Sequence, residues 1–151
     1  MRCVSTKISA YVYIVIAIYK YMRHWIIVVD FGDHIYRFTF QVVPKSSTKT
    51  RNKVLKEIEI FHHCKGHDNI LQLIEYFEEE EKFYIVFEKM EGGTLLETIQ
   101  RRGHLTEQEA SLVIRDIARA LDFLHKKGIA HRDLKPENIL CVKAGQVRLQ
   151  C

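Results

Sequence analysis

A long amphipathic helix near the C-terminal end of the chain limits its possible folds more than any other feature. Thr106 and Glu109 have the spacing of a capping box, which satisfies backbone N–H groups of a first helical turn. Apolar residues then recur at helical spacing and predict a helix over residues 107–126; they are Ala110, Val113, Ile114, Ile117, Leu121 and Leu124. Gly128 is expected to end this helix. Its apolar stripe has to pack on other elements, so the segment belongs to a folded domain.

The polar segment after this helix is the second constraint. Residues 131–138 read His-Arg-Asp-Leu-Lys-Pro-Glu-Asn. Residues 138–142 and 146–149 are short apolar runs around a turn at Ala144-Gly145, which predicts two strands. The octapeptide, between a helix and a hairpin, resembles the catalytic loop of serine/threonine protein kinases. The alternative interpretation is a polar surface turn between two elements.

The resemblance implies a role for each polar residue of the loop. Asp133 would orient the substrate hydroxyl and accept its proton late in phosphoryl transfer. Lys135 would place a compact cation beside the γ-phosphate, and Asn138 would offer a neutral oxygen to Mg²⁺. His131 and Arg132 would support the loop and not react. The lysine at position 135 favours serine or threonine acceptors, because tyrosine kinases fill that position differently.

Two apolar, aromatic-rich runs upstream predict a pair of strands over residues 70–77 and 82–88. The four glutamates between them predict a solvated hairpin turn, and a partner-binding patch is the alternative. The second run ends in a sequence that resembles the kinase hinge, with Phe87 as gatekeeper beside the adenine. Backbone groups of Glu88 and Met90 would then hydrogen-bond the adenine, and Leu140 would lie under its ring.

Two further helices are predicted. Thr94 and Glu97 form another capping box, which opens a short helix that stops near Gly103. Residues 53–64 carry apolar side chains on one helical face and resemble the kinase C-helix. Glu57 falls at the position of its ion-pairing glutamate. The alternative is that Glu57 is a solvated surface residue.

Longer segments narrow the resemblance. Three runs of residues are similar to the MAP-kinase-interacting kinases, in the calcium/calmodulin-dependent kinase group. They read Phe-Tyr-Ile-Val-Phe-Glu-Lys-Met-Glu-Gly-Gly, Ala-Leu-Asp-Phe-Leu-His and Gly-Ile-Ala-His-Arg-Asp-Leu-Lys-Pro-Glu-Asn-Ile-Leu-Cys. This similarity covers about residues 42–142. It implies ATP and Mg²⁺ as cofactors, and a protein substrate and an upstream MAP kinase as partners.

The chain also departs from the kinase pattern. Residues 1–41 contain no Gly-x-Gly-x-x-Gly loop to cover the ATP phosphates, and no Val-Ala-Ile-Lys strand precedes the C-helix. An ungapped alignment places Gln41 where the phosphate-pairing lysine is expected, and a neutral amide cannot replace that cation. Lys45 is the nearest lysine, but Pro44 beside it cannot donate to the ladder of a central strand. The sequence closes at Cys151, before the expected Asp-Phe-Gly or Asp-Phe-Asp motif.

The first 41 residues fit no kinase pattern. The apolar run over residues 8–19 is shorter than the roughly 20 residues that span a bilayer. Basic residues precede it as in a signal peptide, but no small-residue cleavage site follows. We therefore expect a β-rich or disordered leader, with a membrane or signal segment as the alternative. The run Phe-Thr-Phe-Gln before Val42 also fits translated intron sequence joined to a kinase exon.

Composition excludes several other classes. The chain of 151 residues is 47% hydrophobic and 28% charged, enough for one domain-sized core. Its net charge of +4 is mild and its basic residues are scattered, so nucleic-acid binding is not expected. The cysteines lack paired spacing and fit free thiols in a reducing compartment. A single His/Cys cluster without a second ligand pair is interpreted as a helix end rather than a zinc site; it comprises His62, His63, Cys64 and His67.

Together these observations predict an α+β, incomplete two-lobed kinase-like fold. Residues 1–41 are assigned as the leader, 42–88 as an N-lobe remnant, 89–93 as the hinge and 94–151 as the start of the C-lobe. The predicted function is phosphoryl transfer from ATP to protein Ser/Thr hydroxyls in the parent family, with this chain inactive as written. The alternative is a non-catalytic, pseudokinase-like binding or decoy module. A cytoplasmic or nuclear location is expected, with membrane anchoring through the leader as the alternative.

Overall fold

The computed structural model describes residues 24–30, 35–142 and 145–150 of the chain, which forms two compact units. The first unit contains the described residues up to Thr48 together with residues 74–89, and the second contains residues 49–73 and those from Met90 on. The apolar run over residues 8–19 lies outside the described residues. None of the described helices is long and apolar enough to cross a membrane.

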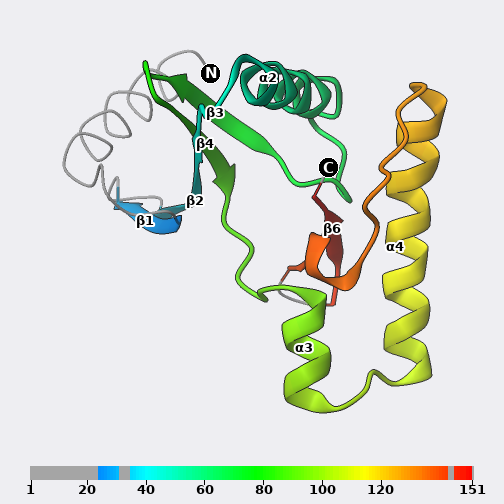
Figure 1. Cartoon of the computed structure of the whole chain (residues 1–151). Coiled ribbons are helices and arrows are strands. Elements are labelled where there is room, and N and C mark those ends of the chain that lie inside the picture. The colour runs from blue at the N-terminus through cyan, green and yellow to red at the C-terminus, as the bar shows by residue number, and fades with distance from the viewer. Residues whose placement is uncertain (1–23, 31–34, 143–144, 151) are drawn as a thin grey trace. The chain divides into compact units, whose positions relative to one another are not determined.

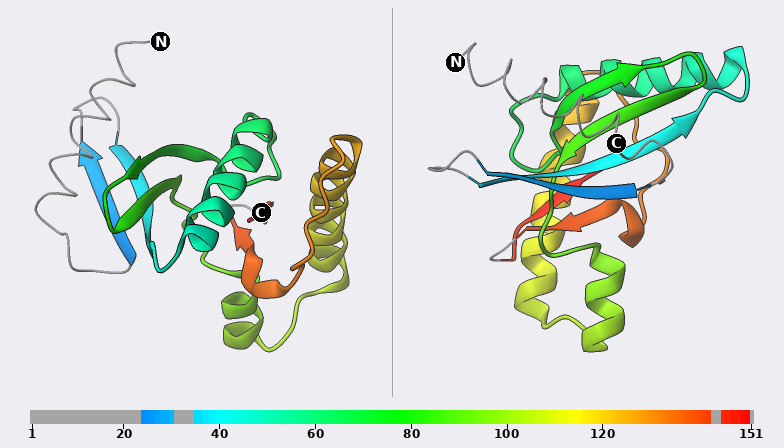
Figure 2. Two further views of the ribbon diagram at one scale, coloured as in Figure 1. Left: turned by 45° about the horizontal axis from the view of Figure 1, so that its top comes forward. Right: turned by 90° about the vertical axis from the view of Figure 1, so that its left-hand side faces the viewer.

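The first unit is built on a four-stranded sheet, whose strands lie side by side in Figure 2 in the order β1-β2-β4-β3. The strands are β1 (His24–Asp30), β2 (Ile35–Pro44), β3 (Leu73–Glu78) and β4 (Lys82–Glu88). β2 is antiparallel to both neighbours, with Gln41 opposite His24 of β1 and Ile85 of β4. Each residue from Phe83 to Phe87 is buried, because β4 is an inner strand of the sheet.

Strand predictions for this unit are largely confirmed. Residues 82–88 form β4 as predicted, and the turn through the glutamates is closed by a 2.9 Å hydrogen bond from the Glu79 N–H to the Lys82 carbonyl. β3 begins three residues later than predicted, at Leu73. Ile70 and Leu71 instead meet Leu149 of the second unit's hairpin, to whose carbonyl the Leu71 N–H donates at 3.0 Å. β2 runs without a break through the predicted domain boundary after residue 41, and that boundary stays a prediction.

The second unit contains three α-helices, a 3-10 turn and a hairpin. They are α2 (Thr48–His63), α3 (Leu95–Arg102), α4 (Glu107–Lys126), η1 (Pro136–Asn138), β5 (Ile139–Cys141) and β6 (Val147–Leu149). α4 has the predicted bounds, and both predicted capping boxes are formed. The predicted helix from residue 53 begins five residues earlier, at Thr48. β5 and β6 pair antiparallel, as predicted.

A buried polar clamp holds the hairpin on α4. The Asp116 side chain is only 2% exposed, although it lies on the apolar face of α4. Its Oδ2 accepts a hydrogen bond from the Val147 N–H at 3.3 Å, while Asn69 Nδ2 donates to the Val147 carbonyl at 3.2 Å. The Leu149 N–H then donates to the Asn69 carbonyl at 2.9 Å. Buried polar groups cost free energy unless they are paired, so these bonds fix the hairpin at one position against α4.

A bidentate ion pair joins the end of α3 to the start of α4. Arg102 Nη1 and Nη2 donate to the two carboxylate oxygens of Glu109 at 2.8 and 3.0 Å. Glu109 also accepts the Thr106 N–H at 2.9 Å within the capping box. The Arg102 hydrogen bond, followed by those from Thr106, lowers the pKa of Glu109 from 4.5 to about 2.

This pKa shift predicts a pH dependence of stability. A carboxyl whose pKa is lower in the folded than in the unfolded state contributes stability above pH 4.5, and this is lost as pH falls through about 2. We expect the melting temperature of the Glu109→Gln variant to fall less steeply than that of the wild type over this window. Glu107→Gln, which removes a charge from the same turn, is the control. If the melting temperatures of the wild type and of Glu109→Gln fall equally steeply between pH about 5 and about 2, the prediction is wrong.

Candidate functional site

The polar loop after α4 takes a sharply turned backbone. Arg132 has φ of 63°, in the left-handed region that residues other than glycine rarely adopt. Pro136 opens the 3-10 turn η1, whose Asn138 N–H donates to the Lys135 carbonyl at 3.0 Å. The loop therefore folds back on itself, so that residues 133 and 138 come into contact.

The three predicted catalytic side chains meet at one point. The Asp133 carboxylate oxygen Oδ2 lies 2.8 Å from Lys135 Nζ and 2.9 Å from Asn138 Nδ2. The same amide nitrogen donates to the Asp133 carbonyl at 2.8 Å. Because the nitrogen of Asn138 is engaged in this way, its amide oxygen is the atom that could ligate a metal. The Asp133 side chain is 65% exposed, so a substrate can reach the carboxylate.

Electrostatics keep this carboxylate ionised. Hydrogen bonds from Lys135 and then Asn138 hold the pKa of Asp133 below its usual value. The same contact with Asp133 raises the pKa of Lys135. Asp133 is therefore an acceptor and Lys135 a cation at neutral pH. A carboxylate of low pKa is a poor general base, but it can orient a hydroxyl and receive a proton late in the reaction.

His131 ties the loop to the end of the hairpin. Its Nε2 lies 2.7 Å from the Gln150 carbonyl, which can only accept, so Nε2 carries a proton. Its Nδ1 then accepts the Asp133 N–H at 3.3 Å. Gln150 in turn donates its N–H to the Asn138 carbonyl at 2.9 Å. His131 thus supports the loop as predicted, through a partner that local sequence did not reveal.

The predicted nucleotide-contacting residues lie on different parts of the chain. Phe87, which is buried, and Glu88 end β4 in the first unit. Met90 is the first residue of the predicted hinge that belongs to the second unit, and it lies two residues before Gly92. Leu140 is the central residue of β5 and is bridged to Thr94. Met90 and Leu140 are therefore held in the same unit as the polar loop of residues 131–138.

A close backbone contact fixes the hinge's end to β5. The Gly92 N–H donates to the Cys141 carbonyl at 3.0 Å, and the Cys141 N–H donates to the Gly93 carbonyl at 2.8 Å. A Cβ atom at Gly92 would lie 2.6 Å from the Cys141 carbonyl oxygen and 2.6 Å from its Cβ. Only glycine allows this approach, because any Cβ atom would clash with Cys141.

The positions expected to hold the phosphate-binding ion pair differ from the kinase pattern. Glu57 on α2 lies 3.8 Å from Lys53, one helical turn earlier. Gln41 lies within β2, an inner strand. Lys45 Nζ is 2.5 Å from a Glu78 carboxylate oxygen, donates to the Glu79 carbonyl at 2.6 Å and stands 4.9 Å from the Phe83 ring centroid. Lys45 is therefore engaged at the acidic turn, which is a further reason not to assign it the phosphate-pairing role.

The His/Cys cluster is accounted for by packing. Cys64 is buried in the core of the second unit, and His67 Nδ1 accepts the Asn69 N–H at 3.2 Å. The His67 ring also packs on Phe123, with 4.4 Å between the ring centroids. Over the described part of the chain, no three His, Cys, Asp or Glu side chains gather as a metal site. Cys64 and Cys141 are free thiols.

Known proteins share extended sequence similarity with this chain. The protein kinase domain model matches residues 36–150, which is more than half of the chain. MAP kinase-interacting serine/threonine-protein kinase 2 of Xenopus laevis is 56% identical over 110 residues, which cover 73% of this chain and 24% of that protein. The corresponding kinase 1 of Xenopus tropicalis is 55% identical over 104 residues, covering 69% and 25%. A MAP kinase-interacting kinase of Caenorhabditis elegans is 49% identical over 111 residues, covering 73% and 16%. The chain thus spans about a quarter or less of the length of these curated relatives.

Proposed function

Because this chain belongs to the protein kinase family and is similar to the MAP kinase-interacting serine/threonine kinases, we propose that residues 131–138 are a phosphoryl-transfer loop for serine or threonine hydroxyls. The contact of Asp133 with both Lys135 and Asn138 carries this proposal. The family relationship and the predicted α+β kinase fold are confirmed. The roles of individual residues are proposals.

In the proposed mechanism Asp133 accepts a hydrogen bond from the substrate hydroxyl and aligns its oxygen for attack on the γ-phosphate. Lys135 moves its ammonium group from Asp133 toward the phosphate, which restores the carboxylate's capacity to accept. Asn138 would hold Mg²⁺ through its amide oxygen, and a magnesium ion bound there would neutralise phosphate charge. The exposed carboxylate and the free amide oxygen fit this chemistry.

ATP is the proposed phosphate donor. Backbone groups of Glu88 and Met90 would bond the adenine, Phe87 would close its pocket, and Leu140 would contact the ring. Glu57 would have its ion pair with a lysine at position 41, where this chain has glutamine. The relatives' names describe kinases that interact with MAP kinases, and we propose a MAP kinase as a partner here as well. The cytoplasmic or nuclear location stays a prediction.

We further propose that the chain as written does not turn over, and the observation behind this is Gln41. A neutral amide supplies no positive charge for the phosphates, whose placement by countercharge is most of the catalysis. The same observation favours the second candidate function, a non-catalytic binding module. The chain incubated with MgATP is expected to give no detectable autophosphorylation or peptide phosphorylation. Clear turnover that Asp133→Asn abolishes would refute the inactivity and support the loop's role.

A further inference from the structure

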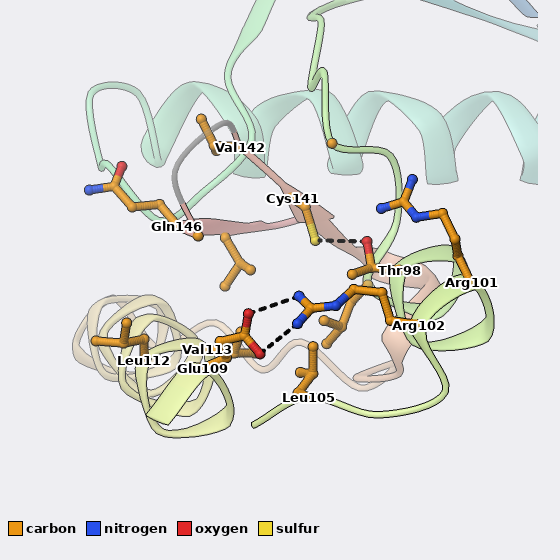
Figure 3. A pocket seen from close by; sticks show the side chains of 14 residues that line it. Thr98, Arg101, Arg102, Leu105, Glu109, Leu112, Val113, Cys141, Val142 and Gln146 are labelled. Carbon is orange, nitrogen blue, oxygen red and sulfur yellow. Dashed lines mark hydrogen bonds and ion pairs between the residues drawn. The ribbon is translucent and has the colours of Figure 1, made fainter. Parts of the chain in front are cut away.

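A pocket of about 280 Å³ lies between α3, the start of α4 and the β5–β6 hairpin, within the second unit (Figure 3). Its wall is mostly apolar and is formed by Leu95, Leu105, Leu112, Val113, Val142 and Val147. Thr98 and Cys141 add a hydroxyl and a thiol, which contact each other at 3.8 Å. Small-molecule sites are concave and mostly apolar with a few polar groups, and this pocket is at the small end of their size range.

Three charged residues line the pocket, and only two of them pair with each other. Arg102 and Glu109 both line the pocket, but they neutralise each other through their two hydrogen bonds. Arg101 also lines the pocket, is exposed, and has no hydrogen bond or ion pair with another described residue. The three charges sum to +1, since two arginines face one glutamate. One uncompensated guanidinium therefore remains beside an apolar cavity.

We propose that this pocket binds a small amphipathic carboxylate, with a single aromatic ring or branched alkyl group in the cavity and its carboxylate on Arg101. The apolar wall provides burial for the body of the ligand. A planar guanidinium matches a carboxylate with two parallel hydrogen bonds. The Arg102–Glu109 pair stays closed, so the ligand does not have to break an existing interaction.

The pocket is independent of the proposed nucleotide site. Side chains alternate along a strand, so Ile139 and Cys141 of β5 share one face and Leu140 takes the other. Ile139 belongs to the core of this unit and Cys141 packs against it, whereas Leu140 is not part of that cluster. A ligand in the pocket and an adenine on Leu140 would lie against opposite faces of β5. Binding in the pocket therefore requires neither ATP nor catalytic activity, and failure of either proposal leaves the other intact.

The test titrates the ¹⁵N-labelled whole chain with 4-phenylbutyrate, without nucleotide, and follows amide shifts. Shifts are expected at Gly92, Gly145 and Val147, with a Kd of about 1 mM for a ligand of this size. The neutral analogue 4-phenylbutanamide is expected to bind about threefold more weakly, the effect of one exposed ion pair. Shifts confined to residues outside the pocket would overturn the site.

Variants separate the two parts of the proposal. Arg101→Gln should reduce affinity for the acid to that for the amide, while Arg119→Gln, at an exposed arginine outside the pocket, should change neither. Thr98→Phe, which fills the cavity, should weaken both ligands at least tenfold. If the acid and the amide bind equally to the wild type, the carboxylate contact is wrong. Unchanged binding to a Thr98→Phe variant that retains a native amide spectrum would overturn the pocket assignment.

Discussion

Replacing Asp133 with asparagine is expected to lower phosphate transfer by about a thousandfold. The assay requires an active background, so residues 36–150 of this chain replace the matching segment of the Xenopus laevis relative, and Gln41→Lys is included. An amide cannot take the hydroxyl proton, and it replaces the negative charge that holds Lys135 at 2.8 Å. The turnover number should fall while the KM for ATP changes little, because Asp133 acts on the acceptor hydroxyl.

The matched control for this loss is Asp122→Asn. Asp122 is also an exposed aspartate paired with a lysine, here Lys126 at 2.7 Å, but it lies on α4 away from the loop. This variant should retain the activity of the chimera. Equal turnover of the Asp133→Asn chimera and its parent would show that residue 133 does not handle the acceptor hydroxyl.

Adding a single Cβ at Gly92 is expected to lower the free energy of unfolding by about 3 kcal/mol, the upper range for forced overpacking. The new atom would meet the backbone of Cys141, which cannot move without disturbing two hydrogen bonds. That loss is large beside a typical stability of about 5–15 kcal/mol. Urea unfolding of Gly92→Ala measures the change directly.

Gly103→Ala separates this clash from backbone strain. Gly103 has a φ of +82° and open space where a Cβ would lie, whereas Gly92 does not have a left-handed φ. Alanine at position 103 should therefore cost about 1 kcal/mol, from conformation alone. If the two variants are destabilised equally, close contact with β5 is not the reason for glycine at position 92.

Local signals in the sequence were sufficient to predict α3 and α4. Their capping boxes, apolar spacing and terminal glycines all lie within the helices or directly beside them, so the predicted bounds and N-terminal capping boxes agree with the structure. The start of α2 was missed because residues 48–52 are polar and show no helical stripe. The start of β3 was missed because Ile70 and Leu71 pair with Leu149, a partner that local sequence cannot indicate.

The residues of the candidate site were predicted from the sequence, but the contacts that support them were not. Asp133, Lys135 and Asn138 were predicted because they lie within one octapeptide. The Asn69–Asp116 clamp and the contact of His131 with Gln150 were not, since they join segments far apart in the chain. One signal was present: Asp116 falls at helical spacing from Val113 and Ala120, on the apolar face of α4. A carboxylate at such a position needs a buried partner.

The role of Gln41 is tested by comparing the chimera with and without Gln41→Lys in a single peptide-phosphorylation assay. We expect the loop of residues 131–138 to be competent and the lack of a cation at position 41 of β2 to prevent turnover. Gln41→Lys is expected to raise kcat/KM about 10- to 150-fold, since a charge-assisted hydrogen bond contributes about 1.5–3 kcal/mol. Comparable activity of the unsubstituted chimera would contradict this expectation, because Gln41 would then not limit the reaction.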